Sequence, residues 1–184
     1  MRFEILVIAI LGFTIIASTS SQAFAAVDMF IKIDTIDGES TDKTHGKEID
    51  VLSWSFGASQ SGSMAMGGGA GAGKVVMQDF HFTKSVDKSS PKLFEALATG
   101  KHLKDATFVI RKAGGEPHEY LKFTFTDALI SSYSTGGSSG EDRPTESISL
   151  NFAQIKMSYV EQDASGRAGA ATEFGWDIKA NKKI

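Results

Sequence analysis

Residues 134–159 read STGGSSGEDRPTESISLNFAQIKMSY, and they contain three patterns in succession. A Gly/Ser-rich run comes first, a charged corner with one proline follows, and a long segment with apolar residues at alternate positions ends the stretch. Turn residues beside alternating segments are typical of antiparallel strands, because successive side chains of a strand point to opposite faces. The stretch therefore predicts long β-strands, and it contains no convincing enzyme site.

The same alternation recurs along most of the chain after residue 26. We predict strands at about residues 28–33, 48–60, 74–85, 106–113, 119–132, 146–161 and 172–178. Seven strands suit a barrel or a sandwich. One helix is expected between them, with Ser89 or Ser90 as N-cap, Pro91 at its first position and Gly100 at its end. A single helix closing one end of a β-barrel fits this order.

The alternation also assigns faces to the strands. Leu52, Trp54 and Phe56 share one face, whereas the small residues between them share the other. The strand near residue 123 repeats this arrangement. We predict that the second face forms a polar wall, made by Ser53, Ser55, Ser59, Thr124, Thr126, Ser149 and Asn151.

The alternation changes phase within residues 146–161. Ile148, Leu150 and Phe152 keep one phase, whereas Ile155 and the apolar residues after it keep the other. We predict a β-bulge near residues 153–154, which reconciles the two phases and bends the strand.

The first 25 residues predict a leader and not a part of the fold. Residues 5–16 form an apolar run that is short for a membrane span, and polar residues and then Ala23-Phe24-Ala25 follow it. We expect a signal peptide, residues 1–25, ahead of one domain, residues 26–184. An uncleaved anchor and a start codon assigned too far upstream are the alternatives. No stable membrane insertion is expected after the leader is removed.

Composition limits the remaining classes of function. The 184 residues include no cysteine, which excludes thiol catalysis and thiolate metal sites. A formal net charge of −3 without long runs of like charge gives no support to nucleic-acid binding. The 4 histidines lack the spacing of a metal site, so we expect neither a metal nor another cofactor.

Two glycine-rich segments imitate catalytic motifs. Residues 68–74 match part of a phosphate-binding loop, but Val75 stands where Ser or Thr should hold magnesium, and a strand is predicted next instead of a helix. Residues 136–140 match a nucleophile elbow around Ser138, which also needs a helix after it. We expect a loop and a turn, and no enzyme. A serine hydrolase built on Ser138 is the disfavoured alternative.

Several further segments carry a specific resemblance. They are VDMFIKI at 27–33, GES at 38–40, DKTH at 42–45, EIDVLSWSFG at 48–57, QSGS at 60–63, GAGKV at 71–75, QD at 78–79, IRKAGGE at 110–116 and FGWDI at 174–178. Together with residues 134–159 they resemble the Hcp family, the tube protein of bacterial type VI secretion systems. The resemblance implies a mainly β fold, a β-barrel of two antiparallel sheets with one α-helix.

The resemblance also implies a function. It implies hexameric rings of this chain that stack head to tail into a tube, are expelled by a contractile sheath and carry effectors in their lumen. Effectors, spike and sheath proteins would be the partners, and the polar wall becomes a candidate for the lumen. The candidates for subunit contacts are Asp42, Lys43, His45, Met64, Met66, Glu141, Asp142 and Arg143. Residues 141–143 can equally be a solvated turn.

The leader and the resemblance predict different routes out of the cell. Hcp rings are expected to assemble in the cytoplasm and to be secreted by the type VI apparatus, whereas a cleaved leader directs a protein to the periplasm. The alternative function is therefore an exported β-barrel binding module that does not assemble into a tube.

Overall fold

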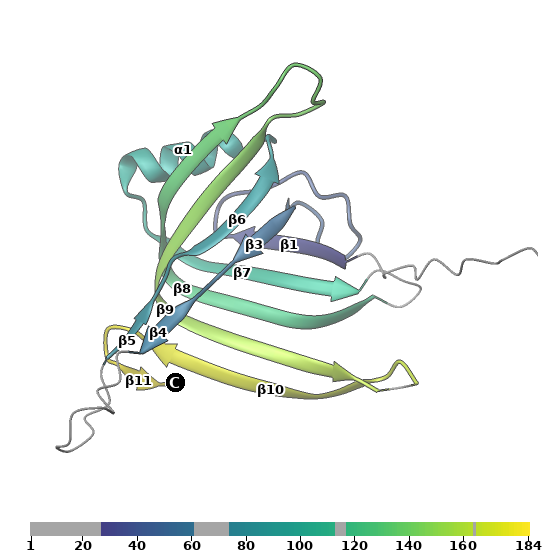
Figure 1. The fold of residues 1–184 in the computed structure, drawn as a ribbon, viewed down its shortest axis with the longest axis vertical. Helices are drawn as coiled ribbons and strands as arrows, with labels where there is room; N and C mark the ends of the chain where they lie inside the picture. Colours follow the sequence, from purple (N-terminus) through teal and green to yellow (C-terminus); the bar gives the residue numbers. More distant parts are fainter. Residues whose placement is uncertain (1–26, 61–73, 113–116, 164) are drawn as a thin grey trace, which may run out of the picture.

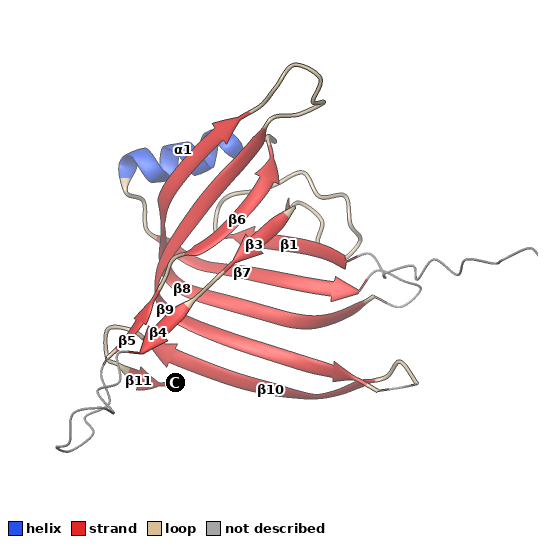
Figure 2. Cartoon of the chain, viewed as in Figure 1, coloured by secondary structure: helices blue, strands red, loops and turns tan. Residues whose placement is uncertain are grey.

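The chain folds into a curled antiparallel sheet with one helix beside it (Figures 1 and 2). The computed structural model describes residues 27–60, 74–112, 117–163 and 165–184, and its main sheet has nine strands, with a two-stranded sheet of β4 and β5 beside it. The elements are β1 (Val27–Ile33), β2 (Ile49–Asp50), β3 (Ser53–Ser55), β4 (Ala58–Gln60), β5 (Val75–Met77), β6 (Phe80–Ser85), α1 (Ser90–Thr99), β7 (Leu103–Lys112), β8 (His118–Gly136), β9 (Thr145–Gln162), β10 (Ala168–Asp177) and β11 (Lys182–Lys183).

The long hairpin of β8 and β9 runs through the whole fold (Figure 1). β7 pairs with the first half of β8, and β1 pairs with the other edge of β7. β9 changes partner along its length, because β10 pairs with its second half and β6 pairs with residues 145–150. Residues 49–55 connect two parts of the sheet, since β2 pairs with β1 and β3 pairs with β6. The mainly β fold with one helix is confirmed for the described residues, and the closure of the curled sheet into a barrel stays a prediction.

The phase change predicted within β9 occurs, but a bulge in β9 does not cause it. The pairs on either side of Asp127 keep one register, Thr126 with Gln154 and Ala128 with Phe152. Asp127 itself has a φ of 50°, in the left-handed region that Asp adopts more readily than most residues. The buried phase of β8 changes across Asp127 as well. Both strands therefore bend together at this point, and the register shift of the hairpin lies farther along β8, after Ile130.

Aromatic side chains fill the core on one face of the main sheet. Phe80, Phe108 and Phe125 have no exposed surface. The ring centroids of Phe80 and Phe125 are 4.8 Å apart, and those of Phe80 and Phe108 are 5.0 Å apart. Leu93 and Ala96 of α1 join the same cluster. Burial of each large apolar side chain contributes about 2–3 kcal/mol.

α1 begins and ends where the sequence predicts. Ser89 is the N-cap residue, Pro91 lies in the first turn, and Gly100 ends the helix in the left-handed conformation. The side chain of Ser89 makes no capping hydrogen bond, because its hydroxyl donates to Asp87 instead. The prediction of the helix is confirmed, while the serine hydroxyl stabilises the preceding turn.

A buried ion pair fixes the start of α1 to the sheet. Lys84 of β6 and Glu146 of β9 have side chains that are each 1% exposed, and Nζ of the lysine lies 2.6 Å from Oε2 of the glutamate. Ser90 donates a hydrogen bond to the same oxygen, and Tyr133 of β8 donates to the other one. Burial and the contact with Glu146 raise the pKa of Tyr133 to about 12, so its hydroxyl remains a donor. One carboxylate thus joins α1, β6, β8 and β9.

We expect Lys84→Met to lower the free energy of unfolding by about 3–5 kcal/mol, because Glu146 is then buried without its partner. The double variant Lys84→Met/Glu146→Leu should regain part of this loss, since no buried carboxylate of Glu146 is left to desolvate, while Asp87 still loses its contact with Lys84 at 2.8 Å. Urea denaturation at one fixed protein concentration measures both.

Lys92→Met is the matched control, because Lys92 and Glu95 pair at 3.0 Å with side chains that are 63% and 59% exposed. This variant should change the free energy of unfolding by less than about 1 kcal/mol. Equal losses in the single and double core variants would contradict the account.

Candidate functional site

Small polar side chains form two adjacent rows on the face of the sheet opposite to the core. The strand pairing places Ser55 opposite His81, His81 opposite Ser149, and Ser149 opposite Ser132. The neighbouring row is Ser53, Thr83, Ser147 and Ser134. We call these eight residues the hydroxyl face. The residues that alternate with them, such as Phe82 and Ile148, are buried in the core.

Side-chain hydrogen bonds connect the hydroxyl face across the strands. Ser53 Oγ lies 2.6 Å from Thr83 Oγ1, and Ser149 Oγ lies 2.7 Å from His81 Nδ1. At the border, Asp79 accepts hydrogen bonds from Asn151, at 2.7 Å, and from Ser131. A shallow hollow of about 240 Å³ lies over the middle of this surface and is lined by Ser53, Trp54, Ser55, His81, Phe82, Thr83 and Ser147.

The structure divides the predicted polar wall among three places. Ser53, Ser55, Ser149 and Asn151 lie together on or beside the hydroxyl face. Thr124 and Thr126 lie beyond the bend at Asp127, where Thr124 borders a second hollow of about 320 Å³ with Lys32 and Lys104. Ser59 lies on β4, in the two-stranded sheet.

Sequence reasoning missed five members of the hydroxyl face, namely His81, Thr83, Ser132, Ser134 and Ser147. The signal was present for β6, where Phe80, Phe82 and Lys84 are buried and the residues between them are not. The same alternation in residues 145–150 would have found Ser147. The predicted wall took residues from the strands at 48–60, 119–132 and 146–161 and included none from the strand at 74–85.

Two predicted contact residues, Asp42 and His45, lie in a charged cluster beside β7. Arg111 donates hydrogen bonds from both Nη atoms to Asp42 and from Nη2 to Asp28, at 3.0 Å. Its Cζ lies 4.9 Å from the centroid of the Phe30 ring, which stacks on His45 at 4.5 Å. The cluster holds residues 34–48 against β1 and β7.

His45 is buried between two carboxylates. Its Nδ1 lies 2.9 Å from Glu48 Oε2, and its Nε2 lies 3.3 Å from Glu119 Oε1 without the geometry of a hydrogen bond. Asp42 accepts further hydrogen bonds from the amides of Thr44 and His45. Contacts within the chain therefore occupy Asp42 and His45, whereas Lys43, the third predicted contact residue of this turn, is exposed.

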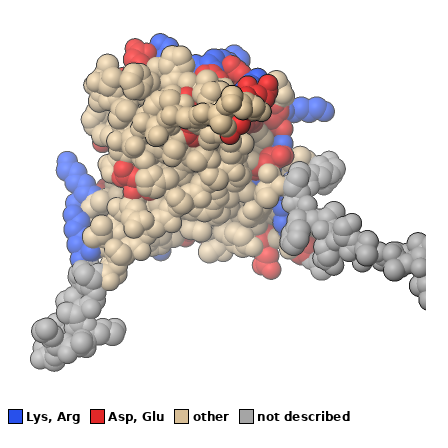
Figure 3. All heavy atoms as spheres, turned by 45° about the horizontal axis from the view of Figure 1, so that its top comes forward, with Lys and Arg blue, Asp and Glu red and all other residues tan. Residues whose placement is uncertain are grey.

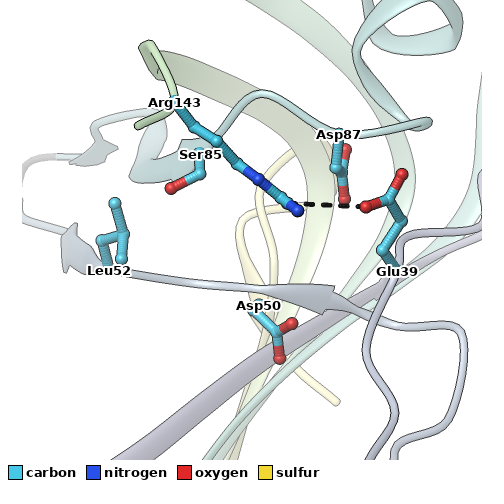
Figure 4. A pocket seen from close by; sticks show the side chains of 6 residues that line it. All are labelled: Glu39, Asp50, Leu52, Ser85, Asp87 and Arg143. Atoms are coloured by element: carbon cyan, nitrogen blue, oxygen red, sulfur yellow. Dashed lines mark ion pairs between the residues drawn. The ribbon is translucent and has the colours of Figure 1, made fainter. Parts of the chain in front are cut away.

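The charged corner at residues 141–143 contacts the same part of the chain. Arg143 Nη1 lies 3.5 Å from Glu39 Oε2, and the pair borders a hollow of about 160 Å³ that Asp50 and Asp87 also line (Figure 4). The carboxylate of Glu141 accepts a hydrogen bond from the amide of Ser138, at 3.3 Å, and Asp142 is exposed. These residues belong to the loop between β8 and β9, which projects from the body of the molecule (Figure 1).

Charged side chains are unevenly spread over the surface. In the view of Figure 3 they gather mainly along the rim, and a broad uncharged area separates them.

A row of core side chains continues onto exposed parts of β9 and β10. The pairing places Phe123 opposite Met157 and Met157 opposite Phe174. Met157, Tyr159 and Phe174 are 41%, 46% and 49% exposed, and we call them the apolar extension. Phe174 stacks on Trp176 at 6.1 Å, so the extension is continuous with the core. Sequence reasoning did not find the apolar extension, because apolar residues at alternate positions of a strand give the same pattern whether their face is covered or exposed.

Strands, and not helices, follow both motif-like segments. Val75 begins β5, so a strand follows the glycine-rich run as predicted, while residues 68–73 and the predicted contacts Met64 and Met66 lie outside the described residues. Ser138 lies in the loop between β8 and β9, and the strand after it confirms a turn. Within the described ranges, no group of His, Asp and Glu could hold a metal ion. In the same ranges no helix has the length and apolar character to cross a membrane.

Comparisons with known proteins agree with one another. Residues 30–159 match the family described as "Type VI secretion system effector, Hcp". The chain is 58% identical over 158 residues to Protein hcp1 of Pseudomonas aeruginosa, a match that covers 85% of this chain and 98% of the relative. A solved type six secretion system protein has a TM-score of 0.82 at 36% identity, covering 86% of this chain and all of that one. Hcp1 from Salmonella typhimurium has a TM-score of 0.71 at 41% identity, covering 86% and 99%.

The Arg111 cluster predicts a pH dependence of stability. The hydrogen bonds from Arg111, and then those from the amide of Thr44, hold the pKa of Asp42 well below its usual range. The folded protein therefore binds this proton less readily than the unfolded chain, so the contribution is complete above about pH 4 and is lost as the pH falls further. We expect Asp42→Asn to lower stability at pH 7 by about 2 kcal/mol and to flatten the profile below about pH 4.

Urea denaturation between pH 2 and pH 7 measures this effect. Lys43→Met is the control in the same turn and should keep the wild-type profile. An Asp42→Asn variant that loses stability as steeply as the wild type below pH 4 would show that other carboxyl groups determine the acid limb.

Proposed function

Because the chain belongs to the Hcp family of type VI secretion proteins, we propose that it forms hexameric rings that stack into the expelled inner tube and carry effectors. The observation that carries the proposal is the match over the whole domain, at 58% identity and with nearly the full length of the relative covered. The chain is a structural protein and not an enzyme. Its partners in this role are further copies of itself, effectors, and the spike and sheath of the apparatus.

The hydroxyl face is our candidate for the wall of the lumen. Its hydroxyl groups are small and uncharged, and those of Ser53 and Thr83 bond to each other, so they offer cargo only weak or water-mediated contacts. Asn151 extends this wall at its border, Thr124 and Thr126 extend it beyond the bend, and Ser59 adds a serine on β4. A wall of this chemistry holds a polypeptide and still releases it.

The apolar extension is our candidate for the contact between neighbours in a ring. A closed ring needs one heterologous interface, and stacking needs a second, different one. Met157, Tyr159 and Phe174 together expose a large apolar surface at one side of the sheet, which is typical of a protein contact.

Charged turns at other places are candidates for stacking. They are Lys43, beside the Arg111 cluster, and Glu141, Asp142 and Arg143 at the base of the projecting loop. Asp42 and His45 support such a contact indirectly, because they fix the turn that carries Lys43. Met64 and Met66 stay candidates from the sequence.

We further propose that residues 26–184 are the assembling domain and that the protein is secreted through the type VI apparatus. Residues 1–25 stay predicted as a leader, whose cleavage would direct the chain to the periplasm instead. N-terminal sequencing of the secreted protein, from strains with and without a working apparatus, tests the leader and the route. We expect the chain to reach the medium only with the apparatus, and its first residue decides the leader, because a chain that begins at Ala26 has passed through leader cleavage. A secreted chain that keeps Met1 would contradict the leader, and secretion without the apparatus would contradict the route.

Native mass spectrometry of residues 26–184 should show a hexamer. Phe174→Lys should give folded monomers, because a charge in the apolar extension would be desolvated in the ring contact. Phe94→Lys replaces another exposed apolar side chain, on α1, and should keep the hexamer. A wild-type monomer would contradict the ring and favour a binding module.

Ser55→Gln should leave the rings intact and reduce effector binding and export several-fold, because the longer side chain fills the hollow on the hydroxyl face. Ser165→Gln, in an exposed turn, is the matched control. Effector co-purification and immunoblots of the medium measure the effect. Unchanged binding and export in rings of Ser55→Gln would reject the lumen assignment.

A further inference from the structure

The geometry of the hydroxyl face points to a subsite for an acidic side chain of the cargo, at the hollow beside His81. This subsite binds the acidic side chain more tightly when His81 is protonated. This inference rests on the proposed function, because it places the hollow on the wall that the cargo meets. It adds to the proposed function a contact between a carboxylate of the cargo and the hollow, and it names protonation of His81 as the condition that strengthens this contact.

The hollow offers hydrogen-bond donors and no carboxylate. Its volume is about 240 Å³, which accommodates a single side chain. The polar side chains of its lining are the hydroxyls of Ser53, Ser55, Thr83 and Ser147 and the imidazole of His81. A carboxylate accepts hydrogen bonds from such groups without repulsion by a like charge.

A hydrogen bond fixes the orientation of the His81 ring. Its Nδ1 lies 2.7 Å from the hydroxyl of Ser149, a residue that is 6% exposed. Within the described chain, Nε2 has no hydrogen-bond partner. When the hydroxyl of Ser149 donates to Nδ1, the neutral ring carries its hydrogen on Nε2. Protonation then adds a hydrogen to Nδ1, which the oxygen of Ser149 can accept, so Nε2 remains a donor and the ring gains a positive charge.

Among the described residues that line the hollow, His81 is the only one that can carry a charge. β3 places Ser53 and Ser55 beside it, and β9 places Ser147 and Ser149 there. β8 contributes serines to the same rows. Asp79, which directly precedes β6, lies at the border of the hydroxyl face. Its two oxygens accept hydrogen bonds from Asn151 and Ser131.

The ion pair next to His81 in sequence belongs to the other face. Lys84 and Glu146 are buried in the core side of β6 and β9, where they bond to each other. A carboxylate supplied by the cargo is therefore the natural partner of protonated His81, and the contact becomes a charge-assisted hydrogen bond.

The test uses assembled wild-type hexamers and two synthetic peptides that differ only in having glutamate or glutamine at several positions. Fluorescence anisotropy measures their affinities at pH 5.5 and pH 8.0, and the glutamate side chains of the peptide are ionised at both values. We expect the glutamate peptide to bind about tenfold more tightly at pH 5.5, and the glutamine peptide to bind equally at both values.

His81→Gln should keep the weak binding seen at pH 8.0 and lose its pH dependence. His102→Gln is the matched control, because His102 is exposed and pairs with Asp127 outside the hollow. Undiminished pH dependence in His81→Gln, or equal pH dependence for both peptides, would overturn the subsite. If His81→Gln does not form rings, imidazole resonances of His81 in wild-type rings decide: no shift on adding the glutamate peptide at pH 5.5 overturns it.

The two proposals fail in distinguishable ways. Monomeric wild-type protein, or export that is indifferent to Ser55→Gln, rejects the tube or its lumen. Hexamers that bind the glutamate peptide without pH dependence reject the subsite and leave the tube intact.

Discussion

The antiparallel ladder between β8 and β9 is the constraint on which the rest of the structure depends. The pairing runs from Leu121 opposite Tyr159 to Gly136 opposite Thr145, and every other strand of the main sheet is added to one of its two edges, directly or through a neighbour. Because side chains on a strand have a period of two, one register defines both the aromatic core and the hydroxyl face. A slip by one residue would exchange the two, placing serines inside and phenylalanines outside.

The bend at Asp127 lets one hairpin serve two environments. On one side of the bend β8 and β9 lie between β7 and β10, and on the other side β9 pairs with β6 and β8 contacts α1. The buried pair of Lys84 and Glu146 lies in this second half, where an incorrect register would separate two charges inside the core. Such a pair contributes little net stability compared with an apolar pair, but it penalises the wrong pairing.

The sequence predicted what depends on local pattern. Alternation located most strands, and Pro91 and Gly100 located both ends of α1. Residues 48–60 were predicted as one strand, but the chain changes partner there, since the amide of Val51 donates to Met29 and that of Leu52 donates to Thr83. A change of the paired strand does not alter the alternation of apolar and polar residues, so the sequence does not reveal it.

The candidate site was only partly predictable for the same reason. Asp42 and His45 were expected at a subunit contact, yet Arg111, far along the chain, and Phe30 engage them. Pairing between distant charges follows from the fold, and composition does not encode it. The apolar extension escaped notice because the pattern reports which side chains share a face and not whether anything covers that face.

The three partners of β9 also imply an order of folding. Phe80 of β6 pairs with Leu150, about 70 residues later, whereas β8 reaches β9 through a short loop. Local closure is faster, so the hairpin forms first and the distant pairing follows. During synthesis β6 leaves the ribosome before β9, and β10 leaves after it. The first part of β9 can therefore pair at once with β6, which is already synthesised. The second part remains an unpaired edge, exposed to aggregation, until β10 is synthesised.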